Sequence, residues 1–512
     1  MVARTLSVLT LLVILCASMA VGQSNRITVQ ADAGTETINR HIYGHFAEHL
    51  GRGIYDGIWY RNADGEFEIR DDVVEALRAI QIPNLRWPGG CFADYYFWKD
   101  GIGPVEDRPT IVNTNWGGVT EDNSVGTHEF MELVERLGTE PIVVGNVGSG
   151  IVQDMAQWWE YVNHPGTSPM ADWRRENGRD EPWNIRYWGV GNESWGCGGN
   201  MRPEYYADLY RRFATFLPAY ENVRPFRIAA GPAGDDYNWT EVMMREAADM
   251  MDGLDIHHYT ILGDWVTRKG HATEYGEAEW FELMRRSWQV EEIIEGHREI
   301  MDRYDPEKRI WMIMGEWGTW HEQEEGSTPG FLYQQNTIRD ALVAGHQLNV
   351  FNNHADRIKM ANIAQTVNVL QAMILTRGEQ LILTPTYHVF EFYNVHHDAT
   401  LLPIEVEVAP YEFQGQSIQA VNATASQADD GSINITLVNL DPNAPRSIET
   451  VLSGANVRSV EGRVLTADDM RAHNTFDNPE VVSPQVFNGA RLSGNTLNVD
   501  LPAKSVVVLT LR

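Results

Sequence analysis

Arg186-Tyr-Trp-Gly-Val-Gly-Asn-Glu193 and Arg309-Ile-Trp-Met-Ile-Met-Gly-Glu316 are two short apolar runs, each of which ends at a glutamate before a polar stretch. Apolar runs of this length that contain aromatic and β-branched residues are typical of buried strands. Up to about residue 390, similar runs alternate with stretches of helical periodicity. Strands that alternate with helices indicate parallel βαβ units, so we predict the α/β class.

Eight runs can be assigned as strands of a closed (β/α)8 TIM barrel over residues 40–390. They are His41–Phe46, Asn84–Trp87, Pro141–Asn146, Ile185–Val190, Arg227–Ala230, Leu254–His258, Ile310–Met314 and Ile358–Ile363. The C-terminal ends of barrel strands meet at one mouth, where we expect Glu193 and Glu316 to face each other. Glycoside hydrolases use two carboxyl groups in such an arrangement to cleave the bond between sugars.

The pattern changes after about Leu401, where short segments alternate apolar and polar residues between turns rich in Asp, Asn, Gly and Pro. This texture predicts a C-terminal antiparallel β-sandwich, jelly-roll-like, over residues 391–512. The run Arg26–Gln30 has no helical partner of its own. We therefore expect the segment 23–39 to add a strand to that sandwich.

The N-terminus carries Arg4, an apolar stretch from Leu6 to Val21, and then Gly22-Gln23. This pattern predicts a signal peptide over residues 1–22 and a secreted or periplasmic protein, with an uncleaved membrane anchor as the alternative. After cleavage the body would not associate with a membrane, because no later segment has 18 uninterrupted apolar residues. Only Cys91 and Cys197 would remain, and the count allows a bridge between them without supporting one.

The charge and the histidine spacing of the chain argue against some classes of function. The net charge of -31 argues against a nucleic-acid partner, because phosphate binding needs clustered Lys and Arg. We expect no cofactor and no metal: the pairs His257-His258 and His396-His397 lack the spacing of a zinc site. For His257-His258, lining a polar ligand site is the better interpretation.

The neighbours of both glutamates suit acid–base chemistry on a sugar. Asn192, next to Glu193, can hydrogen-bond a hydroxyl beside the anomeric carbon. Trp188 and Trp195 can supply the apolar wall that raises the pKa of an acid. Tyr259 is the expected hydrogen-bond donor to Glu316, which has to remain ionised as a nucleophile.

Longer motifs resemble the α-L-arabinofuranosidases of glycoside hydrolase family 51 through nearly the whole barrel. They are Tyr43-Gly-His-Phe-Ala-Glu-His-Leu-Gly-Arg52, Arg86-Trp-Pro-Gly-Gly-Cys-Phe-Ala-Asp94, Trp98-Lys-Asp-Gly-Ile-Gly-Pro104, Gly126-Thr-His-Glu-Phe-Met131, Gly145-Asn-Val-Gly-Ser-Gly150, Trp188-Gly-Val-Gly-Asn-Glu-Ser-Trp195, Asn352-Asn-His-Ala-Asp-Arg357 and Ala361-Asn-Ile-Ala-Gln-Thr-Val-Asn368. The resemblance implies a retaining enzyme that removes terminal non-reducing α-L-arabinofuranosyl residues from arabinoxylan, arabinan or their oligosaccharides. Members often form trimers or hexamers, which makes a homo-oligomer one option for this chain, although nothing in the sequence identifies an interface.

The resemblance also implies roles for particular residues. Glu193 matches the acid/base and Glu316 the nucleophile. Four residues match positions that hold the arabinofuranose ring or the nucleophile: Glu48, Asn192, Tyr259 and Gln365. Two more match positions near the aromatic walls of the sugar site: Trp116 and Trp317. Cys91 stands where some members carry an Asn that contacts the sugar. A thiol is a weaker donor and acceptor than an amide, which puts that contact in doubt.

Two other functions remain open from the sequence. An endo-acting glucanase or xylanase could be built on the same barrel and would show a long open cleft. A non-catalytic carbohydrate-binding protein is the rival from another class, although such a protein has no need for both Glu193 and Glu316.

Overall fold

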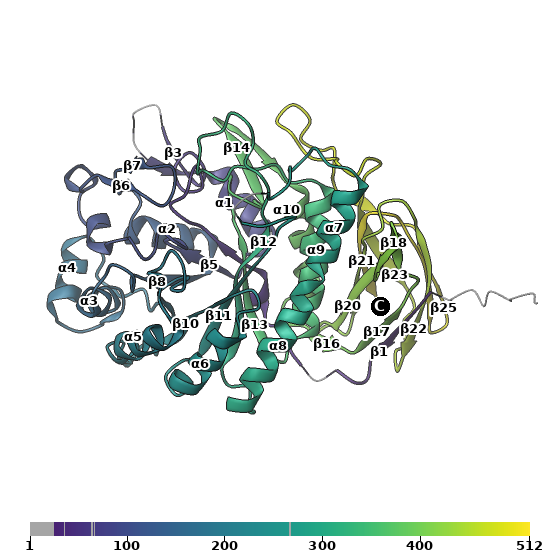
Figure 1. Ribbon diagram of the computed structural model, residues 1–512, viewed down its shortest axis with the longest axis horizontal. Helices are drawn as coiled ribbons and strands as arrows, with labels where there is room; N and C mark the ends of the chain where they lie inside the picture. Colours follow the sequence, from purple (N-terminus) through teal and green to yellow (C-terminus); the bar gives the residue numbers. More distant parts are fainter. Residues whose placement is uncertain (1–24, 35, 63–64, 66, 266–267) are drawn as a thin grey trace, which may run out of the picture.

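The computed structural model describes residues 25–34, 36–62, 65, 67–265 and 268–512. Eight parallel strands close into a barrel in the order β10-β11-β12-β13-β2-β5-β8-β9. Figure 1 shows this barrel beside a second, all-β part of the molecule. The predicted fold class, a TIM barrel with a C-terminal antiparallel domain, is confirmed. The expected signal peptide lies outside the described residues.

The barrel strands are β2 (Gly44–Phe46), β5 (Asn84–Trp87), β8 (Glu140–Gly145), β9 (Tyr187–Val190), β10 (Phe226–Ala233), β11 (Gly253–Thr260), β12 (Trp311–Thr319) and β13 (Ile358–Ala364). The α-helices are α1 (Asp71–Ala79), α2 (Thr127–Leu137), α3 (Val152–Asn163), α4 (Pro169–Glu176), α5 (Pro203–Thr215), α6 (Tyr237–Ala247), α7 (Glu277–Ser287), α8 (Gln289–Tyr304), α9 (Ile338–Asn353) and α10 (Pro385–Tyr393). Short hairpins project from the barrel loops: β3 (Trp59–Arg61) with β4 (Phe67–Ile69), β6 (Ile111–Asn113) with β7 (Val119–Glu121), and β14 (Ile374–Arg377) with β15 (Gln380–Leu383).

Helix α2 illustrates how the sequence sets the ends and the buried face of a barrel helix. The Glu129 carboxylate accepts a hydrogen bond from the backbone N–H of Gly126 at 2.8 Å, which satisfies a donor that the helix leaves free. Gly138 ends the helix with φ +68°, a left-handed conformation that glycine adopts without steric cost. Phe130 and Val134, one turn apart, are buried on the same face.

Side chains from five strands fill the barrel interior below its mouth. Ile142, Tyr187, Phe226, Ile228, Ile313 and Met360 form one buried cluster. Such a layer makes the barrel a packed core rather than a pore.

The β-sandwich consists of two sheets. One has the order β17-β1-β22-β26-β25 and the other β16-β20-β21-β27-β23-β24. Their strands are β1 (Arg26–Gln30), β16 (Thr400–Leu402), β17 (Ile404–Glu407), β20 (Val421–Gln427), β21 (Ile433–Asn439), β22 (Arg446–Ser453), β23 (Val460–Leu465), β24 (Gln485–Val486), β25 (Ala490–Ser493), β26 (Thr496–Leu501) and β27 (Ser505–Leu511). The hairpin β18 (Tyr411–Phe413) with β19 (Gln416–Ile418) accompanies them. Strand β1 pairs antiparallel with β17 and parallel with β22, so the segment Arg26–Gln30 is part of this sandwich.

Helix α9 joins the two parts of the molecule. It lies between the barrel strands and the sandwich (Figure 1), and it contacts β12 as well as β20 and β21. Its residues from Ile338 to Asn352 are all buried, which is typical of a helix enclosed on every side. The expected boundary between residues 390 and 391 falls inside α10, and the extents 40–390 and 391–512 remain proposals. Among the described residues, no helix is both long enough and apolar enough to cross a bilayer.

We predict that Trp280→Ala destabilises the contact between α7 and the sandwich. The Trp280 side chain is fully buried, and its indole N–H donates to the Leu440 carbonyl at 2.9 Å. Removing a buried Trp side chain costs about 3–5 kcal/mol, so the midpoint of thermal unfolding should fall by several degrees. Tyr205→Ala, at a side chain that is 53% exposed, is the control and should leave the midpoint nearly unchanged. An unchanged midpoint in Trp280→Ala would show that the contact adds nothing to stability.

Candidate active site

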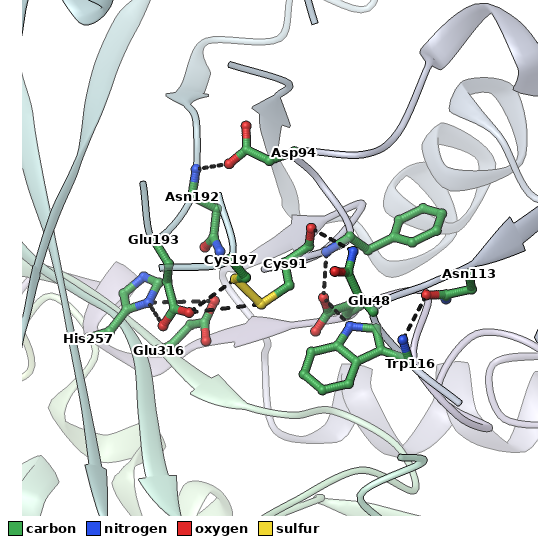
Figure 2. The surroundings of a disulfide bond; sticks show 12 residues. Glu48, Cys91, Asp94, Asn113, Trp116, Asn192, Glu193, Cys197, His257 and Glu316 are labelled. Carbon is green, nitrogen blue, oxygen red and sulfur yellow. Dashed lines mark hydrogen bonds and ion pairs between the residues drawn. A yellow bond between two sulfur atoms is a disulfide. The ribbon is translucent and has the colours of Figure 1, made fainter. Parts of the chain in front are cut away.

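Glu193 and Glu316 come together at the C-terminal mouth of the barrel. Glu193 lies in the loop after β9, and Glu316 lies within β12. One carboxylate oxygen of each, together with a ring nitrogen of His257, lies within 4.8 Å of the others. Figure 2 shows the three side chains pointing toward one another. The structure therefore places the two sequence-predicted glutamates in one site.

Glu316 is held by two donors. Its Oε1 accepts a hydrogen bond from the Arg86 guanidinium at 2.7 Å, and its Oε2 accepts from the Tyr259 hydroxyl at 2.8 Å. Glu316 is only 5% exposed. A cation and a hydroxyl donor both stabilise negative charge on a carboxylate. The donor expected from the sequence, Tyr259, lies at this carboxylate.

Glu193 has a different environment. Burial raises its pKa, a hydrogen bond from His257 acts in the opposite direction, and the negative charge of Glu316 raises the pKa further. The distance from its Oε1 to Nδ1 of His257 is 2.9 Å. A carboxyl with a raised pKa beside an ionised one is the arrangement in which one group can donate a proton and the other can attack.

His257 carries the positive charge between the acids. Burial alone would lower its pKa, but the charges of Glu316 and Asp255 and its hydrogen bonds to Asp255 and Glu193 outweigh that effect and raise the pKa to about 10. Its Nε2 lies 3.3 Å from Asp255, and its Nδ1 lies 3.7 Å from Glu316. A protonated imidazole has no lone pair for a metal ion, so the trio of Glu193, His257 and Glu316 is better suited to proton transfer than to metal binding.

Glu48 lies beside the glutamate pair and is 2% exposed. Its Oε1 accepts from the Phe92 backbone N–H at 3.1 Å and from the Trp116 indole N–H at 2.9 Å, and its Oε2 accepts from Gln365 at 3.0 Å. Burial and the charge of Glu316 raise the pKa of Glu48 to about 7, against the effect of these donors. Three predicted sugar-binding residues, Glu48, Trp116 and Gln365, thus form one hydrogen-bonded group.

Two buried polar atoms at the site are ready for a ligand. Within the described part of the chain, no partner reaches Nδ2 of Asn192 or Oε1 of Gln365. The other end of the Asn192 amide accepts a hydrogen bond from Arg86 at 2.5 Å, which orients the free NH2 group. Buried polar groups are normally paired, so these two atoms are available to hydrogen-bond a polar molecule that enters the site.

Gly89 and Gly90 leave the space that the carboxylates occupy. A Cβ at Gly89 would lie 2.6 Å from Cγ of Glu48, and one at Gly90 would lie 2.6 Å from Oε1 of Glu316. Any side chain at these two positions would displace an acidic group of the site. The close approach of the two acidic side chains therefore requires glycine at both positions of the Pro-Gly-Gly sequence after β5.

Cys91 and Cys197 form a disulfide that links the loop after β5 to the loop after β9. Figure 2 shows the bridge next to Glu193, whose Oε2 lies 3.4 Å from the Cys197 sulfur and 3.9 Å from the Cys91 sulfur. A bonded sulfur has no S–H to donate. Cys91 therefore has no thiol with which to contact a sugar, which agrees with the doubt about that contact. The pairing of Cys91 with Cys197, which the cysteine count left open, is formed.

Trp317 does not line the site, contrary to the expectation. It is fully buried outside the barrel, where its ring packs against Phe351 and Phe390. Successive side chains of a strand point to opposite faces, so the residue after the inward-pointing Glu316 has to point outward. Trp320 instead packs edge-on against Tyr259 at 5.1 Å and shares an apolar cluster with Trp116.

Arg86 and Asp94 received no assigned role from the sequence. Arg86 sits inside the fully buried strand β5, and a charged residue in a buried strand was the signal that could have identified it. Asp94 accepts hydrogen bonds from the backbone N–H groups of Val147 and Gly148, and from Asn192 at 2.7 Å. Asp94 thereby fixes the loop that carries Glu193. No local sequence pattern predicts its contact with Asn192.

Comparisons with known proteins agree with this geometry. Residues 76–277 match the model of the α-L-arabinofuranosidase 1 domain, and residues 315–505 match that of the α-L-arabinofuranosidase C-terminal domain. The chain is 50% identical over 499 residues to an intracellular exo-α-L-arabinofuranosidase of Bacteroides ovatus, with 97% of each chain covered. An intracellular exo-α-(1→5)-L-arabinofuranosidase of Acetivibrio thermocellus is 28% identical over 493 residues, which cover 89% of this chain and 93% of the relative.

A solved structure is also similar along the whole chain. The GH51 arabinofuranosidase from Xanthomonas axonopodis pv. citri superposes with a TM-score of 0.93 at 48% identity, and the match covers 96% of this chain and 100% of that one.

These relatives contradict one expectation. A secreted or periplasmic location was predicted from the apolar N-terminal stretch, whereas the Bacteroides and Acetivibrio enzymes are both named intracellular. A short apolar segment after a single Arg is a weak signal, because it reflects hydrophobicity and not the use of the segment for export.

This chain therefore belongs to the α-L-arabinofuranosidases of glycoside hydrolase family 51, as the two matched domain models, the Bacteroides relative at 50% identity and the superposed Xanthomonas structure all show.

Proposed function

We propose that this protein removes terminal non-reducing α-L-arabinofuranosyl residues from arabinose-containing glycans, with net retention of configuration. Glu316 attacks the anomeric carbon and forms a covalent glycosyl-enzyme while Glu193 protonates the departing oxygen. Glu193 then takes a proton from water, and that water releases arabinose from Glu316. The observation that carries the proposal is the close approach of the two carboxylates in one buried site.

The separation of the carboxylates supports retention over inversion. Retaining enzymes hold their two carboxyl groups about 5–5.5 Å apart, whereas inverting enzymes need about 6.5–9.5 Å to admit a water molecule. Here an oxygen of Glu193 lies within 4.8 Å of one of Glu316. A water molecule has little room between them, whereas the anomeric carbon of one sugar can be in reach of both.

The electrostatic environments support the division of roles. Arg86 and Tyr259 favour a charged Glu316, as a nucleophile requires, and burial favours a protonated Glu193, as a general acid requires. We assign Glu48, Asn192 and Gln365 to binding the hydroxyl groups of the ring, since each presents a buried polar group to the same place. Trp116 supplies the aromatic wall beside Glu48.

The enclosure of the site favours an exo-acting enzyme over an endo-acting glucanase or xylanase. Glu48 and Glu316 are at most 5% exposed, which fits a pocket that receives a chain end. A chain bound along its length would need an open cleft. We propose arabinan and arabinoxylan, or their oligosaccharides, as substrates; the Acetivibrio relative is named for the α-(1→5) linkage found along an arabinan chain.

Glu316→Ala should abolish turnover, because no other group can form the covalent intermediate. Glu193→Ala should reduce kcat/KM for arabino-oligosaccharides by about 10²–10⁴-fold, the usual contribution of a general acid. The same variant should retain much more activity on an activated aryl α-L-arabinofuranoside, whose leaving group departs without protonation. Steady-state rates on the two substrates provide the comparison, with Glu132→Ala on the exposed face of α2 as the matched control. Equal losses on both substrates in Glu193→Ala would refute the acid assignment.

His257→Gln should move the alkaline limb of the kcat/KM profile to higher pH. This limb reports loss of the proton from the acid of the free enzyme. The hydrogen bond and positive charge of His257 both lower the pKa of Glu193, so removing the charge should raise that pKa. His164→Gln, at a histidine outside the site, should leave the profile in place. An alkaline limb that stays fixed or moves to lower pH in His257→Gln would show that His257 does not act on the acid.

A further inference from the structure

A cavity of about 430 Å³ opens on one side of the proposed acid. It is lined by Glu193, His257 and Tyr259 and continues along the loops after β10 and β11 to the start of α8. Among the described residues, Glu316, Glu48 and Gln365 do not line this cavity. It is therefore next to the buried sugar site without being part of it.

The position of the cavity relative to the two glutamates suggests what it binds. In Figure 2, Glu48 and Trp116 lie to one side of Glu316, whereas Glu193 and His257 lie to the other. A general acid has to be within hydrogen-bond reach of the glycosidic oxygen that it protonates. The group attached to that oxygen must then leave past Glu193, where the cavity is.

The walls of the cavity have the composition of a sugar site. Trp195 and Trp265 are aromatic walls, and the Trp195 indole N–H is fixed by the Gly231 carbonyl at 3.1 Å. The Trp265 ring is 52% exposed and packs edge-on against Tyr259 at 5.8 Å and Trp320 at 4.9 Å. Aromatic surface with a few placed polar groups is typical of small-molecule sites.

His258 adds an unused hydrogen-bonding atom. In the described part of the chain, no partner reaches its buried Nε2, and the side chain lines the cavity. Burial lowers the pKa of His258 to about 4, with Asp235 acting in the opposite direction, so the ring is neutral at neutral pH. A neutral imidazole can donate to or accept from a sugar hydroxyl.

The charge of the cavity wall is negative. Three exposed carboxylates line it: Asp235, Asp264 and Glu292. The Arg286 guanidinium also lines it, but that cation already pairs with Glu282 at 2.6 Å and donates to the Gly263 carbonyl at 3.0 Å. A ligand with its own carboxylate would face like charges without a free cation from Arg286, and like charges brought close repel.

We propose that this cavity binds the sugar to which the arabinofuranosyl group is attached, and that the carboxylates of Asp235, Asp264 and Glu292 make it select neutral sugars over uronic acids. Trp265 stacks on that sugar, and His258 hydrogen-bonds one of its hydroxyl groups. The proposal rests on the proposed function and adds the chemical class of the leaving group. Arabinofuranose on neutral chains is then a substrate, and the same residue on a uronic acid is a poor one.

The test compares two synthetic disaccharides that carry the same α-L-arabinofuranosyl group on glucose or on glucuronic acid. We expect the wild-type protein to show a kcat/KM roughly tenfold higher for the neutral disaccharide, and added salt should reduce this ratio by screening. The double variant Asp235→Asn, Glu292→Gln should lower the ratio by at least about threefold, and Asp264 is left as the remaining charge of the wall. The matched control Glu204→Gln, Asp208→Asn, at exposed positions of α5, should keep the wild-type ratio.

A second variant tests the aromatic wall. Trp265→Ala should reduce kcat/KM for the neutral disaccharide roughly tenfold more than for an aryl α-L-arabinofuranoside, and Phe216→Ala, at another side chain that is 52% exposed, should not. A wild-type ratio near one, or a double variant that retains the wild-type ratio, overturns the charge selection. Equal losses on both substrates in Trp265→Ala overturn the leaving-group site. Failure of the wild-type protein to cleave the aryl arabinofuranoside would instead refute the proposed function.

Discussion

The buried guanidinium of Arg86 is the contact on which the site depends. Two carboxylates within 4.8 Å of each other in a nearly enclosed pocket repel, and burial makes each charge costly. Arg86 donates to Glu316 at 2.7 Å and to the Gly315 carbonyl at 3.1 Å, and its other nitrogen orients Asn192. The same cation thus stabilises the charge of the nucleophile and aims the amide that is proposed to bind the sugar.

The barrel supplies the positions that this charge balance requires. Strands β5, β9, β11 and β12 bring Arg86, Glu193, His257 and Glu316 to one mouth, although these residues are far apart in the sequence. Gly89 and Gly90 keep the space for the acids, and the bridge from Cys91 to Cys197 ties the loop after β5 to the loop after β9, which carries Glu193. The electrostatic difference between the two glutamates therefore results from long-range packing and not from their immediate sequence neighbours.

Periodicity and motif sequences were sufficient to predict the barrel, the sandwich and the pair of glutamates. Strand ends in a parallel barrel converge by geometry, so Glu193 and Glu316 could be placed together without coordinates. Trp317 was misplaced because its role was taken from the family resemblance without considering strand alternation, which turns its side chain away from the mouth. The disulfide and the contacts of Asp94 could not be predicted, since both join loops whose approach depends on the whole barrel. The location was wrong because an apolar N-terminal stretch does not determine export.

The stereochemistry of the reaction tests the account most directly. Proton NMR during hydrolysis of an aryl α-L-arabinofuranoside by the wild-type protein, recorded before mutarotation, identifies the anomer of arabinose that is formed first. A double displacement through Glu316 predicts the α-anomer, which has the configuration of the substrate. First appearance of the β-anomer would show a single displacement by water and would contradict the roles assigned to Glu193 and Glu316.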